Sequence, residues 1–126
     1  MRLFCCFVLS CLLGACGKND TDTLPEQWSV MRTAFDEIKT GHYEKYLTYV
    51  DSSQMTPSQK KMTITALRQK YEGIDTASLY ISFRKINSIS EDTVELFYTT
   101  HISPTDSSYC MDRMVRKSDN WKILLY

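Results

Sequence analysis

The sequence predicts an α+β domain in which N-terminal helices cover one face of a curved, four-stranded antiparallel sheet. Three observations lead to this prediction. Apolar residues recur every three or four positions up to Gly73, as in amphipathic helices, and every second position afterwards, as in strands. Turn residues divide the alternating region into four segments. The patterned region is about a hundred residues long, which suits one domain.

The first predicted helix begins at Pro25, because proline is tolerated in the first turn, and Thr23 is a candidate cap just before it. Gly41 is expected to end this helix. Its inward side should carry the apolar residues Trp28, Met31, Phe35 and Ile38. A shorter helix over residues 43–50 should follow, with an inward side formed by Tyr46, Leu47 and Val50.

The third predicted helix has the strongest start signal in the chain. Thr56 and Gln59 have the spacing of a capping box, in which each side chain bonds the backbone of the other residue. Pro57 suits the first turn, and Gly73 is expected to end the helix. Its apolar stripe consists of Ile64, Leu67 and Tyr71.

The alternating segments begin after Gly73. The first strand has apolar residues at Leu79, Ile81 and Phe83, and the pattern then shifts to Ile86. This shift predicts a β-bulge or a bend at residues 84–85. A turn at residues 90–92 leads to the second strand, one face of which carries Val94, Leu96, Tyr98, Thr100 and Ile102.

Turn residues also delimit the last two strands. A longer connection over residues 103–107 contains Pro104, and it leads to a third strand over residues 109–117. Residues 119–120 are expected to form a tight turn before a fourth strand over residues 121–126. Helices followed by a meander of four strands give the α+β arrangement.

A short apolar segment precedes this domain. Met1 and Arg2 supply a positive start, and residues 3–13 are apolar apart from Ser10. At about 1.5 Å per residue, this segment is much shorter than the roughly 30 Å hydrocarbon layer of a membrane. A cleaved signal peptide is therefore favoured over an uncleaved anchor.

The end of this segment, Leu13-Gly14-Ala15-Cys16, resembles the lipobox of bacterial lipoproteins. The resemblance implies that Cys16 becomes the first mature residue, with a diacylglycerol on its thiol and palmitate or a similar acyl chain on its amine. Such chains would hold the protein on a membrane. We therefore expect a signal peptide at residues 1–15, a lipidated cysteine and tether at 16–24, and one domain at 25–126. The expected location is the cell envelope, on a bacterial membrane, with the outer membrane favoured.

The cysteine content and the net charge restrict the disulfides and the classes of binding partner that we expect. Cys5, Cys6 and Cys11 would leave with the signal peptide, so Cys110 is the remaining thiol and no intramolecular disulfide is expected. Removal of Arg2 leaves 14 basic residues against 15 acidic ones. This near-neutral balance argues against a nucleic-acid partner.

Two segments carry a family resemblance. Residues 39–46, Lys-Thr-Gly-His-Tyr-Glu-Lys-Tyr, resemble the step between the first helices of nuclear transport factor 2-like, or cystatin-like, domains. Residues 116–123 resemble their last hairpin, in which a turn precedes an inward tryptophan. The layout is also similar to that of small lipoproteins with lumazine-binding-like domains of unknown function.

The resemblance covers residues 25–126 and implies a cone, in which the sheet curls around a long helix and leaves a pocket. Members of this superfamily include isomerases, dehydratases and domains without chemistry, so the fold does not select a function.

Strand parity suggests what could line this pocket. One side of the third strand carries a single charge, at Arg113, and the other carries two, so the Arg113 side is expected to face inward. This side consists of Tyr109, Met111, Arg113 and Val115. A buried guanidinium needs an anionic partner. Arg113 could bind the carboxylate or phosphate of a ligand, flanked by Tyr98, Thr100 and Tyr109. Alternatively, it pairs with an acidic residue of the protein, or a bulge turns it to solvent.

The sequence offers little catalytic chemistry. Neither of its two histidines has a second metal ligand at helix or strand spacing, and four glycines are too few for a glycine-rich phosphate loop, so no metal site or cofactor is expected. His101 and Asp112 could form an acid–base pair across two strands, but an ordinary polar pair on the outer face is the favoured interpretation. We assign no catalytic residue.

Three functions remain open. The favoured one is a membrane-tethered, non-enzymatic module that binds a small anionic ligand or a protein partner in the cell envelope. The second is a small enzyme that transfers protons in the cone, with Tyr98, Arg113 and Asp112 as participants. The third is a structural lipoprotein that pairs, as a homodimer or with another protein, through its tyrosine-rich second helix. Tyr43, Tyr46 and Tyr49 lie on that helix, although tyrosines at the wet edge of a core are the favoured explanation for them.

Overall fold

The structure is a computed structural model that describes residues 24–125; the predicted signal peptide, Cys16, the cap at Thr23 and Tyr126 lie outside the described residues. Within this range, helices α1 (Glu26–Lys39), α2 (Tyr43–Tyr46) and α3 (Pro57–Tyr71) precede strands β2 (Tyr80–Ser90), β3 (Thr93–Ser103), β4 (Asp106–Lys117) and β5 (Asn120–Leu124). A turn of 3-10 helix, Leu47–Tyr49, continues α2. The strands form one antiparallel sheet in sequence order, which confirms the predicted α+β class.

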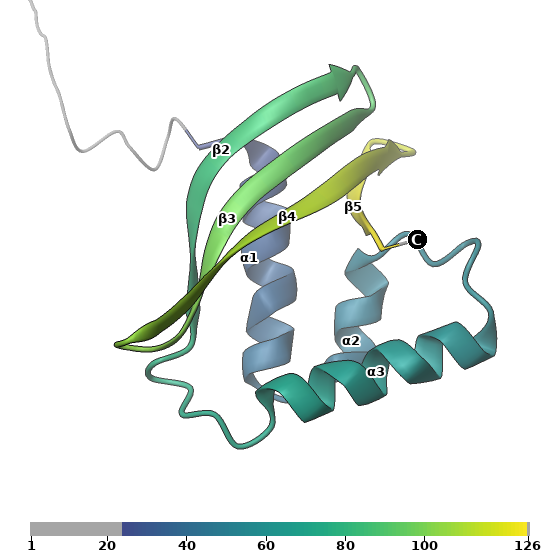
Figure 1. Ribbon diagram of the computed structural model, residues 1–126. Helices are drawn as coiled ribbons and strands as arrows, with labels where there is room; N and C mark the ends of the chain where they lie inside the picture. Colours follow the sequence, from purple (N-terminus) through teal and green to yellow (C-terminus); the bar gives the residue numbers. More distant parts are fainter. Residues whose placement is uncertain (1–23, 126) are drawn as a thin grey trace, which may run out of the picture.

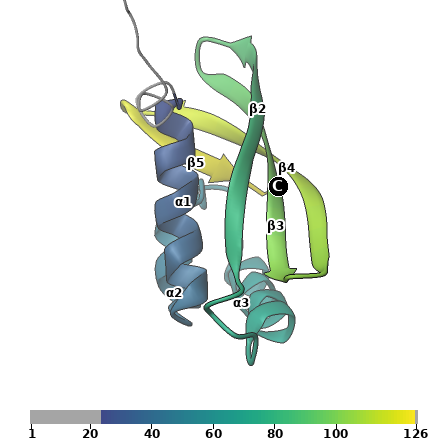
Figure 2. The same ribbon diagram turned by 90° about the vertical axis from the view of Figure 1, so that its left-hand side faces the viewer.

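The helices lie on one side of the curved sheet (Figures 1 and 2). Helix α1 runs along the sheet, and α3 crosses below α1 and α2 (Figure 1). We call the sheet side that faces the helices the inner face, and the opposite side the outer face. The most deeply buried side chains lie between the helices and the inner face, at 0–1% exposure, and are Ala34, Leu79, Leu96, Met114 and Ile123.

The predicted start of α3 is confirmed. The Gln59 backbone N–H donates to Thr56 Oγ1 at 3.1 Å, and the Thr56 N–H donates to Gln59 Oε1 at 2.9 Å. Gly73, just after this helix, has a φ of +87°, which favours glycine. Pro25 is the N-cap of α1 rather than its first residue. The helix expected over residues 43–50 consists of only one α-helical turn, followed by the 3-10 turn.

The predicted bulge in the first strand is also confirmed. Phe83 pairs with Tyr98 and Lys85 with Phe97, so Arg84 is an extra residue in β2. The predicted connection over residues 103–107 is wrong, because Ser103 already pairs with Asp106 and the turn is confined to Pro104 and Thr105. The last turn is formed by residues 118–119, which both have positive φ angles, instead of 119–120. Such angles match the right-handed twist of a two-residue hairpin.

The expectation that the Arg113 side of β4 faces inward is wrong. Met114 is fully buried on the inner face, whereas Tyr109 is 78% exposed on the outer face. The register explains this orientation, because Met114 pairs with Val94 of β3, which the core already buries. The number of charges on each side of the strand gave the wrong orientation, because both charged residues on the Met114 side have partners. Asp112 bonds a hydroxyl on the inner face, and Arg116 bonds Asp92 near the end of the sheet.

Candidate functional site

A tyrosine and an aspartate meet on the inner face of the sheet. The register of β3 and β4 pairs Tyr98 with Cys110 and Leu96 with Asp112, so Tyr98 and Asp112 are diagonal neighbours on one face. The Tyr98 hydroxyl donates a 2.6 Å hydrogen bond to Asp112 Oδ2. Trp28 of α1 packs against the Tyr98 ring at 6.2 Å between ring centroids. Packing and pairing therefore fix this hydroxyl–carboxylate contact.

Burial changes the acidity of the groups at this contact. It raises the pKa of the Asp112 carboxyl, although the Tyr98 hydrogen bond and the charge of Lys70 act in the opposite direction. Burial, followed by the negative charge of Asp112, raises the pKa of both Tyr98 and Tyr46 well above the ordinary tyrosine value. Both tyrosines are therefore neutral hydrogen-bond donors at physiological pH, and Asp112 accepts the hydrogen bond of Tyr98.

An apolar cleft opens beside this contact, between α3 and the end of β5. It has a volume of about 410 Å³ and is lined by Tyr46, Met62, Thr63, Ala66, Leu67, Lys70 and Leu125. We call it the α3 cleft. A second hollow of about 370 Å³ shares Leu125 with it and is lined by Met111, Asp112, Arg113, Leu124 and Leu125. The Lys70 cation in the lining of the α3 cleft is close enough to Asp112 for its charge to lower the pKa of that carboxyl.

The four residues expected to bind a ligand do not form one site. Tyr98 and Thr100 lie on the inner face, where Thr100 is 2% exposed and its hydroxyl contacts the Cys110 thiol at 3.3 Å. Arg113 and Tyr109 lie on the outer face. Arg113 pairs with Glu95 at 3.3 Å, which is the alternative that the sequence left open for it.

His101 and Asp112 do not form a pair. The His101 ring stacks on Tyr80 at 4.2 Å between centroids, and its Nε2 lies 3.0 Å from the Ser82 hydroxyl, all on the outer face. Asp112 lies on the inner face, so the sheet separates the two side chains. The expectation that they share a side is wrong, because it depended on the incorrect parity of β4.

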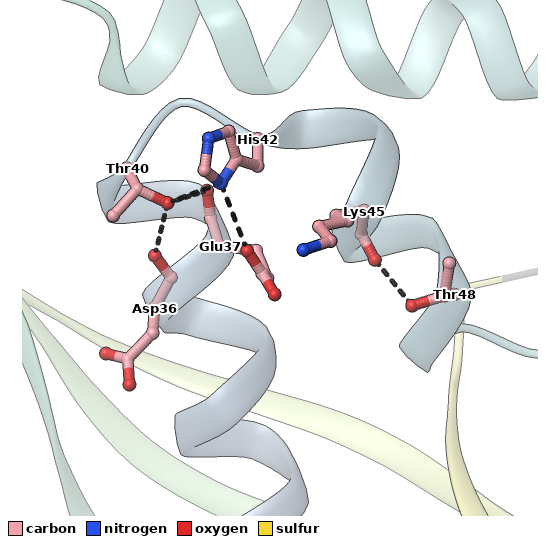
Figure 3. A network of polar contacts seen from close by, with 6 residues as sticks. All are labelled: Asp36, Glu37, Thr40, His42, Lys45 and Thr48. Carbon is pink, nitrogen blue, oxygen red and sulfur yellow. Dashed lines mark hydrogen bonds and ion pairs between the residues drawn. The ribbon is translucent and has the colours of Figure 1, made fainter.

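The corner between α1 and α2 contains the other histidine. His42 Nδ1 lies 3.3 Å from Glu37 Oε1 and 3.1 Å from the Thr40 hydroxyl, and this hydroxyl also donates to the Asp36 carbonyl (Figure 3). These bonds fix the tight corner at Gly41, whose φ is +81°. The network thus orients α2, which places Tyr46 at the α3 cleft.

The sequence named Tyr98 and Asp112 together, as participants in proton transfer, but gave no indication of Tyr46 and Lys70 beside them. A signal for the contact was present, because Asp112 lies between Cys110 and Met114 on one side of the strand. A lone acid on an apolar side needs a partner, and a tyrosine is one of the few residues that can supply a hydrogen bond there.

Within residues 24–125, no group of three or more histidine, cysteine, aspartate or glutamate side chains is placed to hold a metal ion. No helix in the same range is long and apolar enough to cross a membrane.

Comparisons with known proteins identify the fold. No protein-family model and no curated protein sequence matches the chain. A solved structure from Campylobacter jejuni, provisionally named as an NTF2-like (nuclear transport factor 2-like) transpeptidase, matches with a TM-score of 0.62 and 12% identity over 81% of this chain and 100% of its own. An NTF2-like protein of unknown function from Shewanella oneidensis matches with a TM-score of 0.56 and 13% identity, covering 82% of this chain and 94% of its own.

These similarities show an NTF2-like fold, as the sequence resemblance implied. Helices packed in the concavity of a curved, unclosed sheet are the arrangement of this cone-shaped α+β class. Because the fold hosts many activities, the function must be argued from the site.

Proposed function

We propose that this protein is a lipid-anchored module of the bacterial cell envelope that binds a small amphipathic ligand in the α3 cleft. The observation that carries the proposal is an apolar cleft of about 410 Å³ whose lining includes the cation Lys70, the charge of which acts on the partly buried carboxyl of Asp112. Apolar pockets with a few convergent polar groups are typical small-molecule sites. The ligand would place its apolar body against Leu67 and Leu125 and its polar head toward Lys70 and Asp112.

The lipid anchor is supported by the apolar leader and the lipobox-like residues that end at Cys16. We expect the expressed protein to incorporate radiolabelled palmitate, and the Cys16→Ser variant to incorporate none and to leave the membrane fraction. Cys11→Ser, a change in the same leader, is the matched control and should keep the label. Equal labelling of the Cys16→Ser variant and the wild type would contradict the anchor.

Binding in the α3 cleft can be tested with anilinonaphthalene sulfonate, which has an apolar ring system and an anionic head. We expect its fluorescence to rise with the full chain, and Ala66→Trp to abolish most of this rise because the new side chain fills the cleft. Thr65→Trp places the same side chain on the exposed neighbouring position, outside the cleft lining, and should leave the signal unchanged. Equal signals from both variants would exclude the cleft as the site.

Proton transfer is the second candidate, and the contact between Tyr98 and Asp112 favours it. A carboxylate with a raised pKa is a better general base at neutral pH, and a neutral tyrosine can stabilise a developing oxyanion. The two groups bond each other, however, so a substrate would have to displace this bond. Exchange of carbon-bound hydrogen in a bound carbonyl compound in heavy water would distinguish such an enzyme from a binding module.

A further inference from the structure

The outer face of the sheet carries an exposed patch of aromatic, apolar and cationic side chains. No helix among residues 24–125 covers this face (Figure 2). Three large apolar side chains on it are highly exposed: Tyr109 at 78%, Tyr80 at 51% and Met111 at 46%. We call the outer patch the surface formed by Tyr80, Arg84, Lys85, Phe97, Tyr109 and Met111.

The β-bulge concentrates positive charge on this patch. Because Arg84 is the extra residue in β2, both it and Lys85 direct their side chains over rings of the outer face. The Arg84 guanidinium lies 4.2 Å from the centre of the Tyr109 ring, and the Lys85 ammonium lies 4.9 Å from that of Phe97. Cations held against aromatic rings keep their charge available to a partner.

Few carboxylates balance these charges. Among the described residues of β2, β3 and β4, the outer face carries Glu95, which already bonds Arg113, and Asp106 stands at the start of β4. Neither Arg84 nor Lys85 has an ion-pair partner within residues 24–125. The patch therefore suits an anionic partner with an apolar layer beneath its charges.

The chain enters the domain beside this patch. Leu24 lines a groove of about 420 Å³ between α1 and the edge strand β2, together with Ile81 and Phe83. Cys16 precedes Leu24 by eight residues, which span at most roughly 28 Å when fully extended. A lipid on Cys16 would therefore keep Leu24 within this distance of a bilayer, and with it the edge of β2 that lines the same groove.

We propose that the outer patch docks on the surface of the membrane that holds the lipid anchor. This inference rests on the proposed anchor and goes beyond it, because it gives the domain a fixed orientation. Tyrosine suits the membrane–water interface, and arginine and lysine can place their charges on anionic headgroups while their stems cover apolar surface. Met111 would lie in the headgroup region. A second copy fits less well, because pairing through the same face would bring the same cations together.

Methionine oxidation tests this orientation in the full acylated chain. The chain is placed in vesicles of phosphatidylcholine alone or of phosphatidylcholine mixed with anionic phosphatidylglycerol, and hydrogen peroxide converts accessible methionines to sulfoxides. Met111 is the reporter, and Met62 is the matched control because it is 63% exposed on α3. We expect Met111 to be oxidised severalfold more slowly, relative to Met62, in the anionic vesicles. The Arg84→Gln/Lys85→Gln variant should lose most of this protection.

The intact mass of the same sample separates the two proposals. A chain without acyl mass would overturn the anchor and this inference with it. An acylated chain whose ratio of Met111 to Met62 oxidation is the same in both vesicles would overturn the docking orientation alone. Protection that persists in the double variant would also overturn it, because the cations would then have no role.

Discussion

Replacing Met114 with alanine should lower the free energy of unfolding by about 2–5 kcal/mol, whereas the same replacement at Met111 should change it by less than about 0.5 kcal/mol. Both residues lie on β4, but Met114 is 0% exposed and Met111 is 46% exposed. Truncation at Met114 removes apolar contacts and leaves a cavity in a packed core, while truncation at Met111 removes atoms that already contact solvent.

Urea unfolding followed by the fluorescence of the two buried tryptophans measures this difference. Trp28 and Trp121 are 4% and 7% exposed, so both report loss of the core. The two variants are matched controls for each other, because they make the same chemical change on opposite faces of one strand. A larger loss for Met111→Ala than for Met114→Ala would mean that the faces of β4 are inverted.

The order and type of the elements could be predicted because each has a local cause. Trp28, Met31, Phe35 and Ile38 recur at helical spacing, and all are buried in the structure. The capping box at Thr56 and Gln59 depends on residues three positions apart. The bulge in β2 could be predicted because the apolar positions change from odd to even residue numbers between Phe83 and Ile86.

The site depended on relations that local patterns do not contain. The Arg113 side of β4 has three apolar residues and one charge, whereas the other side has two apolar residues and two charges, so parity alone favoured the wrong orientation. The decisive contact joins Tyr98 to Asp112 across 14 residues and exists only in one register of β3 and β4. A shift by one residue would place these side chains on opposite faces. The position of Arg113 beside Glu95 follows from the same register.

Asp112 gives the site a pH dependence with a definite sign. Its folded-state pKa is raised above the ordinary value of 3.8, mainly by burial, so the folded protein binds this proton more tightly than the unfolded chain does. The stability that this carboxyl contributes is therefore fully present below pH 3.8 and is lost as the pH rises through the folded-state pKa. Relative to the wild type, Asp112→Asn should become more stable over this pH range, because the amide has no charge to bury.

Tyr98→Phe should lower the free energy of unfolding by about 1–3 kcal/mol at pH values where Asp112 is ionised, because the carboxylate then loses the donor of its 2.6 Å bond. The same bond lowers the pKa of Asp112, so its removal should raise that pKa further and extend the pH range over which stability is lost. The cost of Tyr98→Phe should therefore decrease as the pH falls and the carboxyl becomes protonated. In an Asp112→Asn background, the same substitution should have a cost that does not depend on pH.

Urea unfolding of the wild type, both single variants and the double variant, at neutral and at acidic pH, measures the cost of each substitution. An equal cost of Tyr98→Phe at both pH values in the wild-type background would mean that the hydroxyl does not stabilise the ionised carboxylate.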